Sequence, residues 1–407
     1  MQKDKVTPAA SQGVKRISSR LDGIHESATL KLNALVQAMK ARGEDVINLT
    51  AGEPDFDVPE AAKAAVLEGV RANHSKYTAV PGIVPLREAI ARKTSDAQGI
   101  AWNASQVIVT NGAKQALYNA FIALLEPGDE VLIPAPYWLS YPEMVKLAGG
   151  IPKFLPTRFE QGFKLTPEQL RSSLGPRVKA IILNSPSNPT GALYSAEEFQ
   201  ALGRVLEDTG VWVISDEIYD RIVFAPSKFC SFLAANPKLQ QNTVTINGVS
   251  KSAAMTGWRV GWSVAPQDLT DAMSIVQGQC TSGVNALAQD ACLAALRIAE
   301  SEFTPQIARF KARRDLVLEI LSKTRKLRVV APQGAFYVFV GISECLKQNH
   351  GEQEDASGFA ERLLGATGVA VMSGSPFGEP ECIRISFATD EQALKTGCER
   401  LVRFLEI

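Results

Sequence analysis

Residues 246–262 read INGVSKSAAMTGWRVGW and place one lysine, Lys251, among small and apolar residues, eight positions before Arg259. Lysine side chains are usually left in water, so a lysine bracketed by two serines at the end of an apolar run is unusual. One interpretation is a strand-to-loop junction whose lysine points into solvent. The other is a primary amine kept in a pocket for chemistry, and the rest of the sequence helps to decide between them.

The charge balance bounds the class of protein. The chain has 407 residues, with 43 Lys and Arg against 43 Asp and Glu, and no long run of one sign, which argues against nucleic-acid or anionic-membrane binding. No apolar run reaches the roughly 18 residues of a membrane span, and the first 24 residues lack the apolar core of a secretory signal. We therefore expect a cytoplasmic protein that binds small molecules and copies of itself, with no nucleic acid and no membrane partner.

Cysteines and histidines give no metal-binding pattern. The six cysteines stand singly, without a Cys-x-x-Cys pair, which favours reduced thiols over disulfides or a zinc site. The three histidines, His25, His74 and His350, are also far apart in the sequence. We therefore expect no metal site.

Strand-like runs alternate with helical patterns between about residues 60 and 300. The runs, rich in β-branched residues, are QVIVTNG, DEVLIPAP, VKAIILNSP, VWVISDE, TVTINGVS and GWSVAP. Because parallel strands need long crossover connections, this alternation predicts a mostly parallel sheet covered by helices on both faces. Residues 302–322 carry apolar side chains at helical spacing and are expected to form a long helix leading out of this domain.

The C-terminal part has a different pattern. Strand-like segments bounded by Gly and Pro, RKLRVVAPQGAFYVFVGI, VAVMSGSPFG and CIRISFA, precede a terminal helical pattern, and residues 25–43 form another helical segment. We therefore divide the chain into a polar N-terminal segment (1–24), a small α+β domain (25–60 and 303–407) and a large α/β domain (61–302). A cleft between two such domains is the expected place for a ligand.

Polar residues follow several of the predicted strands at their carboxyl ends, where ligands of open α/β sheets bind. The turn Asn111-Gly112 leads into a helix that starts near Ala113, which suits a phosphate group, although a simple tight turn explains it equally well. Asp216 ends a run expected to be buried on both faces. A carboxylate there needs a partner such as a cationic ring nitrogen, or else it begins a turn or caps a helix.

Four further residues have both a structural and a functional interpretation. Asn188, in NSPSNPTG, is able to donate to a phenolate oxygen or to bridge a loop, and Trp138, in PYWLSYPE, to cover a planar ring or to fill the core. Arg259 and Arg384 have apolar neighbours in the sequence, and a buried arginine keeps its charge and requires a planar anion. That anion is either the phosphate or carboxylate of a ligand, or an internal acid.

Together these segments resemble the class I pyridoxal-phosphate (PLP)-dependent aminotransferases, and most closely their bacterial aspartate aminotransferase subgroup. The central signature is the run Gly248-Val249-Ser250-Lys251 with Ala254, Met255, Gly257, Arg259, Val260 and Gly261. The order of the other segments matches too: AGEPDFDVPE, KYTAVPGIVPLREAI, TNGAKQALYN, PYWLSYPE, NSPSNPTG, SDEIYD and RISFA. The resemblance covers residues 25–405. It implies the PLP-dependent transferase fold type I, an α/β fold with a mostly parallel seven-stranded sheet sandwiched by helices and a smaller α+β domain.

The resemblance implies a role for each candidate residue. Lys251 would form a Schiff base with PLP and then act as general base, and Asp216 would keep the pyridine nitrogen protonated. Asn188 and Tyr219 would hydrogen-bond the phenolate oxygen, and Trp138 would stack on the ring; the indole and the amide would also border the substrate. The phosphate end would be surrounded by Gly112, Ala113, Lys114, Ser250, Arg259 and the partner subunit's Tyr77.

The same resemblance implies the substrates. Arg384 would bind the α-carboxylate, which the backbone at Gly52 also approaches, and Lys114 would bind the distal carboxylate of a dicarboxylic substrate. The implied reaction moves the amino group of an amino acid, aspartate first, to 2-oxoglutarate, in a homodimer with shared active sites. Ala253 stands where close relatives often carry an aromatic residue, which would widen the space beside the cofactor. Prephenate, aromatic amino acids and alanine therefore remain alternative substrates.

Other activities of the same fold remain open. A β-eliminating lyase or a cyclopropane-forming synthase uses the same lysine, aspartate and arginine. A regulator that binds PLP as an effector would need a basic DNA-binding module, which we do not expect in the short polar segment before residue 25. A non-catalytic relative is expected to lack Lys251 or Asp216, and both are present.

Overall fold

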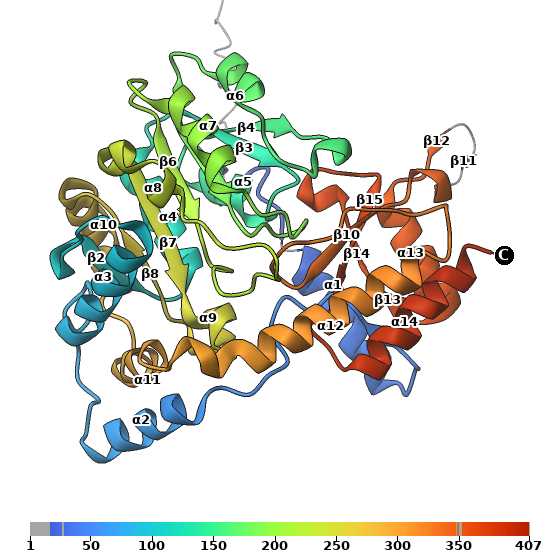
Figure 1. Cartoon of the computed structure of the whole chain (residues 1–407), viewed down its shortest axis with the longest axis horizontal. Helices are drawn as coiled ribbons and strands as arrows, with labels where there is room; N and C mark the ends of the chain where they lie inside the picture. Colours follow the sequence, from blue (N-terminus) through green and yellow to red (C-terminus); the bar gives the residue numbers. More distant parts are fainter. Residues whose placement is uncertain (1–16, 27, 347, 350–351, 407) are drawn as a thin grey trace, which may run out of the picture.

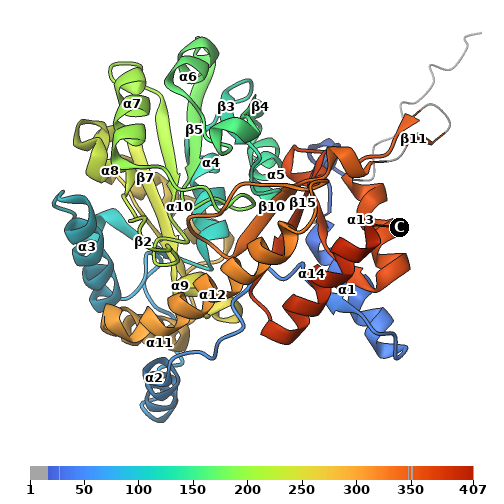
Figure 2. The same ribbon diagram turned by 45° about the vertical axis from the view of Figure 1, so that its right-hand side comes forward.

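The computed structural model describes residues 17–26, 28–346, 348–349 and 352–406. Most of the expected N-terminal segment 1–24, and His350, lie outside these residues. Figures 1 and 2 show a larger body built around a central sheet and a smaller body beside it, with helix α12 (Thr304–Leu321) running from one to the other. The long connecting helix expected at 302–322 is therefore confirmed.

A seven-stranded sheet forms the centre of the large body, in the spatial order β2-β8-β7-β6-β5-β3-β4. Within it, β8 runs antiparallel to both of its neighbours and the other strand pairs are parallel. The predicted mostly parallel, seven-stranded sheet is confirmed. The strands are β2 (Val107–Thr110), β3 (Glu130–Ala135), β4 (Ile151–Pro156), β5 (Val178–Asn184), β6 (Trp212–Asp216), β7 (Thr243–Gly248) and β8 (Gly261–Val264).

Strand β4 is not among the strand-like runs recognised in the sequence. It lies at the edge of the sheet, and its outer side chains Ile151 and Phe154 are exposed. Two of its six residues, Pro152 and Pro156, lack a backbone N–H. Proline is tolerated in an edge strand because its missing N–H needs no partner there, but it removes the alternating pattern that identifies a strand.

Helices cover both faces of the central sheet, because alternate residues of each strand face opposite sides. In β6, Val213 belongs to the apolar cluster under helices α3, α7 and α11, whereas Ile214 belongs to the cluster under α4, α5 and α10. The first group is α3 (Val84–Gln98), α7 (Ala196–Leu206) and α11 (Ala286–Leu296), and the second is α4 (Ala113–Leu124), α5 (Ser140–Leu147) and α10 (Gln267–Cys280). Short helices α6 (Pro167–Ser173), α8 (Phe232–Ala235) and α9 (Val249–Ser252) complete this body.

The small body is built on a four-stranded sheet of order β14-β15-β10-β9, antiparallel throughout. Its strands are β9 (Arg328–Val329), β10 (Tyr337–Gly341), β14 (Met372–Ser373) and β15 (Cys382–Ser386), and its helices are α1 (Ala28–Ala41), α12, α13 (Ala356–Thr367) and α14 (Glu391–Phe404). Two short pairs join it: β1 (Ile47–Asn48) with β13 (Val369–Ala370), and β11 (Gln348–Asn349) with β12 (Glu352–Gln353).

The first two long helices pack against different bodies. Helix α1 packs through Val36 against Val46, Leu364 and Ala370, so the expected packing of residues 25–43 with the C-terminal part is confirmed. Helix α2 (Glu60–Arg71), by contrast, packs against α11 of the large body. These contacts support domain boundaries near residues 60 and 303, which we propose for this chain.

Candidate active site

The carboxyl ends of β5, β6 and β7 and the start of α4 open into a pocket of about 290 Å³ between the two bodies. The large body contributes most of its wall, and the N- and C-terminal parts of the chain contribute Thr29, Leu30, Gly52, Tyr337 and Arg384. The candidate residues that line it are Gly52, Ala113, Lys114, Trp138, Asn188, Asp216, Tyr219, Ser250, Lys251, Arg259 and Arg384. Gly112 lies directly behind this lining and Tyr77 lies outside it.

Lys251 reaches the pocket from helix α9, a single turn that follows β7. Its Nζ donates a hydrogen bond to the Gly52 carbonyl oxygen over 2.5 Å. Burial of the amine, with the positive charges of Arg384 and Arg259, lowers the pKa of Lys251 to about 8, although Glu53 and Asp216 act in the opposite direction. The alternative that this lysine points into bulk solvent is wrong. An amine with this pKa is unprotonated in a useful fraction of molecules near neutral pH.

Asp216 is the last residue of β6, and its side chain is buried, with the residue 4% exposed. Its Oδ2 accepts a hydrogen bond from the Tyr141 hydroxyl over 2.5 Å, and its Oδ1 accepts one from the Ile218 N–H over 3.3 Å. Burial nevertheless raises the pKa of the carboxyl to about 6. The chain continues into a turn, so Asp216 does not cap a helix. A buried carboxylate with so little compensation fits a cationic ring nitrogen as its missing partner.

Arg384, on β15, is buried, with the residue 2% exposed. Its Nη1 donates to Asn188 Oδ1 and its Nη2 to the Thr50 carbonyl oxygen, each over 2.9 Å. Its Nε has no hydrogen-bond partner, and no carboxylate of the described residues forms an ion pair with it. The alternative of an internal ion pair is therefore wrong for Arg384. A buried guanidinium without an anion fits the planar carboxylate of a ligand.

Arg259 differs from the expectation, because it is exposed rather than buried. It adopts a left-handed backbone conformation (φ 54°, ψ 53°) and binds only carbonyl oxygens, those of Thr256 over 2.8 Å and Asn111 over 3.4 Å. The apolar neighbours in the sequence pack elsewhere, and the guanidinium lies at the pocket wall. Within the described part of the chain it pairs with no acid, so it too is available to an external anion.

Two glycines bring the chain segments of this wall together. A Cβ on Gly112, which has a φ of +81°, would lie 2.4 Å from Arg259 Nη2, and a Cβ on Gly261 would lie 2.3 Å from the Ala113 backbone nitrogen. Glycine is therefore required where the start of α4 meets the Arg259 turn. The N-terminal N–H groups of α4, the Arg259 guanidinium and Ser250 form a wall suited to a phosphate, which goes beyond a simple tight turn.

Trp138 and Lys114 lie together at the pocket. The Lys114 Nζ stands 4.9 Å from the centroid of the Trp138 ring, and the indole meets the Tyr141 ring edge-on at 5.4 Å between centroids. Partial burial and the charge of Arg259 lower the pKa of Lys114. Trp138 is only partly buried and lines the pocket, so it is not a residue of the closed core.

Asn188 and Tyr219 present hydrogen-bond donors to the pocket. The Asn188 Oδ1 accepts from Arg384 over 2.9 Å, and Asn188 lines the pocket. The Tyr219 hydroxyl lies 3.1 Å from that of Tyr337, and burial raises the pKa of Tyr219 well above its usual value, so it stays protonated. Both groups are therefore able to donate to a ligand oxygen.

Three candidate residues behave differently from the simplest expectation. A Cβ on Gly52 would meet only the Tyr337 hydroxyl, at an ordinary 3.7 Å, so close approach is not what requires glycine there. Ala253 is 1% exposed within an apolar cluster and does not line the pocket, so it does not widen the space beside a ligand. Tyr77 is 100% exposed and does not reach the pocket of its own chain.

Several pocket residues were not predicted from the sequence. Asn184 ends β5, and its Nδ2 donates to the Asp216 carbonyl oxygen, so the rule that selects strand ends would have found it. Tyr337 lies with its ring 4.3 Å from the Arg384 guanidinium carbon, but it sits inside an apolar strand without a polar signal. Tyr141 comes from helix α5, where no strand-end rule applies.

Among the described residues, no cluster of His, Cys, Asp and Glu is suited to hold a metal ion, and no helix has the length and apolar character needed to cross a bilayer. The pocket instead offers an amine, a buried acid, a phosphate-binding wall and a free arginine. These groups fit the aldehyde, ring nitrogen and phosphate of PLP and the carboxylate of an amino acid.

The chain is similar to known proteins over nearly its whole length. Residues 44–401 match the family model described as aminotransferase class I and II. The chain is 44% identical over 392 residues to an aspartate/prephenate aminotransferase of Cereibacter sphaeroides, covering 95% of this chain and 98% of the relative. It is 42% identical over 391 residues to an aspartate aminotransferase of Geobacillus stearothermophilus, covering 96% and 99%.

Solved structures agree with this comparison. The crystal structure of an aspartate aminotransferase from Rhizobium meliloti superposes with a TM-score of 0.92 at 39% identity, covering 96% of this chain and 99% of that chain. The structure of the Thermotoga maritima aspartate aminotransferase superposes with a TM-score of 0.89 at 39% identity, covering 96% and 100%. With a class I and II signature over residues 44–401 and the fold type I architecture, the chain belongs to the class I and II aminotransferases and is a PLP-dependent aminotransferase.

Proposed function

We propose that this enzyme transfers the amino group of aspartate to 2-oxoglutarate, with PLP attached to Lys251. The observation that carries this proposal is the buried, unpaired guanidinium of Arg384, which lines the same pocket as the Lys251 amine. Lys114 supplies a second cation in that pocket, as a substrate with two carboxylates requires. Relatives named aspartate aminotransferase support the same substrate class.

The cofactor is held by residues of the large body. Ala113, Ser250 and Arg259 receive the phosphate at the start of α4, with Gly112 providing the close approach. Asp216 accepts a hydrogen bond from the protonated ring nitrogen, and Asn188 and Tyr219 donate to the phenolate oxygen while Trp138 covers the ring. When bound, PLP supplies the electron sink that makes the Cα proton of an amino acid removable.

Side chains of the protein bind the substrate and transfer the proton. Arg384 binds the substrate α-carboxylate through a planar pair of hydrogen bonds and so fixes the orientation of the Cα–H bond. The amine of Lys251 would take that proton as general base and, once protonated, give it back as general acid, a task for which a pKa of about 8 is well matched. Lys114 holds the distal carboxylate of aspartate or glutamate.

We also propose a homodimer in which Tyr77 completes the partner's site. Tyr77 is fully exposed, yet the segment beside it is fixed to the large body: Gln289 Nε2 donates to Thr78 Oγ1 over 3.0 Å, and Gln277 Nε2 donates to the Val80 carbonyl oxygen over 2.9 Å. A fully exposed aromatic side chain on a segment that is itself held in place is suited to contact a second subunit. In the dimer its hydroxyl donates to the phosphate of the neighbouring site.

Prephenate is the second candidate substrate. It is favoured by the names of several relatives, among them the aspartate/prephenate aminotransferase of Nitrosomonas europaea, which is 38% identical over 395 residues. Like aspartate, prephenate carries two carboxylates, so the same two cations serve both.

Steady-state rates with a panel of amino donors and 2-oxoglutarate test the assignment. Aspartate is expected to have the highest kcat/KM, with strict dependence on the oxo acid, and glutamate with prephenate as acceptor measures the second candidate. Release of pyruvate and ammonia without any oxo acid would instead identify a β-eliminating lyase and contradict the proposal.

A further inference from the structure

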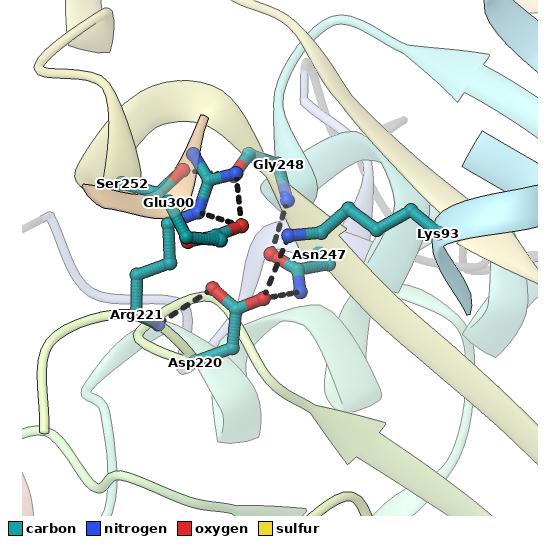
Figure 3. Close-up of polar contacts among 7 residues, drawn as sticks. All are labelled: Lys93, Asp220, Arg221, Asn247, Gly248, Ser252 and Glu300. Carbon is teal, nitrogen blue, oxygen red and sulfur yellow. Dashed lines mark hydrogen bonds and ion pairs between the residues drawn. The ribbon is translucent and has the colours of Figure 1, made fainter. Parts of the chain in front are cut away.

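Outside the pocket, a side-chain hydrogen bond links the turn that carries Lys251 to the turn that follows β6. Asn247 is the residue before Gly248, where β7 ends. Its Nδ2 donates to Asp220 Oδ2 over 3.0 Å, and its Oδ1 accepts from the Gly248 N–H over 2.7 Å. Figure 3 shows Asn247 and Lys93 both directed at the Asp220 carboxylate. Neither Asn247 nor Asp220 lines the pocket.

The strand end determines where the Lys251 amine points. Helix α9 has only four residues, too few to be stable alone, and Gly248 offers no side-chain cap. The Asn247 Oδ1 accepts a hydrogen bond from the Gly248 N–H, which fixes the backbone between the end of β7 and helix α9. At the same junction, the Ser252 hydroxyl donates to the Gly248 carbonyl oxygen over 3.2 Å. The direction of Lys251 therefore depends on contacts around Gly248.

Asp220 belongs to the turn that supplies two other pocket groups. Asp216 and Tyr219 of this turn line the pocket, and the turn is closed by the Asp220 N–H, which donates to the Glu217 carbonyl oxygen over 2.9 Å. The Asp220 carboxylate points away from the pocket to Asn247. The Asn247–Asp220 side-chain hydrogen bond thus joins the turn of the amine to the turn of the acid and the phenol, beside the backbone bond from the Glu217 N–H to the Ile246 carbonyl oxygen.

Burial and a nearby counter-charge restrict the geometry of this hydrogen bond. Asn247 is buried, the Asp220 side chain is 11% exposed, and Lys93 Nζ stands 3.4 Å from Asp220 Oδ2 as a counter-charge. The remaining oxygen, Oδ1, accepts from the Arg221 N–H over 2.8 Å. A charged hydrogen bond in such surroundings holds a stricter geometry than one in water.

An outer ion pair lies beside this cluster without touching Asn247. Arg221 donates to Glu300 Oε1 from Nε over 3.1 Å and from Nη2 over 2.7 Å, and the Glu300 side chain is 69% exposed. The Arg221 side chain is only 8% exposed and also lies 4.3 Å from the centre of the Phe303 ring, and glutamine at position 300 keeps an acceptor for it. Glu300 therefore provides a matched control for the removal of one acid in the same neighbourhood.

We propose that Asn247 and Asp220 are positioning residues, whose hydrogen bond sets the turn of Lys251 relative to the turn of Asp216 and Tyr219. The proposal rests on the role proposed above for Lys251. It assigns a task in the reaction to two residues that touch neither cofactor nor substrate.

Three variants of the full-length holoenzyme test it. Asn247→Asp sets two carboxylates against each other where 3.0 Å now separates donor from acceptor, while the Gly248 N–H keeps its acceptor. The double variant Asp220→Asn with Asn247→Asp restores one donor and one acceptor with their roles exchanged, at the net charge of the native chain. Glu300→Gln is the control. The readouts are the midpoint of the pH titration of the cofactor's visible absorption, which reports on the Lys251 linkage, and kcat.

The expected result is a reciprocal pattern. Asn247→Asp shifts the absorption midpoint by about half a pH unit or more and lowers kcat about tenfold or more, as small misplacements of a catalytic group do. The double variant returns the midpoint to the native pH and kcat to within about twofold of the native enzyme, and Glu300→Gln leaves both unchanged. An unchanged midpoint and kcat in Asn247→Asp, or a double variant as impaired as the single one, overturns the proposal.

Two further measurements keep the test decisive. If Asn247→Asp does not fold, Asp220→Ala, which removes the acceptor, takes its place against the same control and the same criteria. Borohydride trapping of cofactor on Lys251 in the native enzyme is measured alongside. Trapping at another residue refutes the proposed role of Lys251, whereas trapping on Lys251 with no effect of the variants refutes only the positioning role.

Discussion

The Tyr141 hydroxyl donates a hydrogen bond of 2.5 Å to Asp216 Oδ2, which links helix α5 to the buried acid at the end of β6. The same segment carries Trp138, whose ring meets that of Tyr141 edge-on. Trp138, which is proposed to cover the ring of the cofactor, and Tyr141, which supports Asp216, are therefore held by one short stretch of chain. A substitution of Tyr141 is therefore expected to weaken the hydrogen bond proposed between Asp216 and the ring nitrogen.

Tyr141→Phe tests this support. The hydrogen bond from Tyr141 opposes the effect of burial on Asp216, so its loss raises the pKa of the carboxyl further and weakens its hold on a protonated ring nitrogen. We expect kcat to fall about tenfold, in line with a hydrogen bond to a charged group. Steady-state kinetics and the cofactor dissociation constant measure the effect. Tyr194→Phe, which removes another buried hydroxyl, is the control, and an equal loss there would assign the effect to packing.

Asp216→Asn is expected to stabilise the apoenzyme while abolishing transamination. The pKa of about 6 in the native protein exceeds the ordinary 3.8, so the folded state binds more protons than the unfolded state. The free energy of unfolding therefore falls as this carboxyl ionises, between about pH 4 and pH 6. At pH 8 the variant should therefore be more stable by about 2–3 kcal/mol, and near pH 4 the difference should vanish. Urea unfolding at both pH values measures it. A variant less stable than the native apoenzyme at pH 8 would contradict the assigned burial cost.

The reactivity of Lys251 towards the free cofactor should follow its lowered pKa. Covalent attachment of PLP to the apoenzyme is expected to accelerate through a midpoint near pH 8, well below the 10.5 of an ordinary lysine. Stopped-flow absorption measures the rate against pH. Lys251→Ala should fold, form no adduct and show no transamination, and normal turnover by this variant would refute the assignment.

Arg384→Lys and Lys114→Ala separate the two carboxylate sites. A lysine at 384 cannot supply a planar pair of donors, so every amino acid substrate should lose about a hundredfold in kcat/KM. Lys114→Ala should weaken aspartate and glutamate while sparing a monocarboxylic donor such as alanine. The ratio of kcat/KM between the two donor classes is the measurement. A loss confined to dicarboxylates in Arg384→Lys would exchange the two roles.

Subunit mixing tests the proposed place of Tyr77. Tyr77→Ala and Lys251→Ala each damage a different half of a shared site, so hybrid dimers contain one intact site when the two variants are combined. Random mixing should restore about a quarter of the native specific activity. Mixing Tyr77→Ala with native-like Glu300→Gln subunits is the control for exchange. Activity no higher than the average of the two variants would place Tyr77 outside the site.

Much of the fold follows from patterns that lie within single segments. The apolar runs of β2, β5, β6 and β7 are buried and lead to the turn of Gly112, to Asn184, to Asp216 and to the turn of Lys251, so the strand-end rule points to the pocket. The edge strand β4 has no such run, because its outer face meets solvent and prolines interrupt it.

The remaining errors concern contacts between segments. Tyr141 reaches Asp216 from a helix, which no local pattern reveals. Arg259 has apolar neighbours in the sequence, but a left-handed backbone turns its side chain to the pocket wall and leaves it exposed. Ala253 lies two residues from Lys251 and yet packs into the core, because side chains on a single helical turn diverge. Side-chain direction depends on the tertiary structure and is not encoded in spacing alone.

The substrate side of the site is assembled from the two ends of the chain. The Leu49 carbonyl oxygen accepts from the Ser386 N–H over 2.8 Å, and that of Thr50 accepts from Arg384. During synthesis on the ribosome, residues 49–52 emerge more than three hundred residues before the strand that completes them. The residues proposed to hold the cofactor, 112–259, therefore all leave the ribosome before Arg384, which is proposed to bind the amino acid.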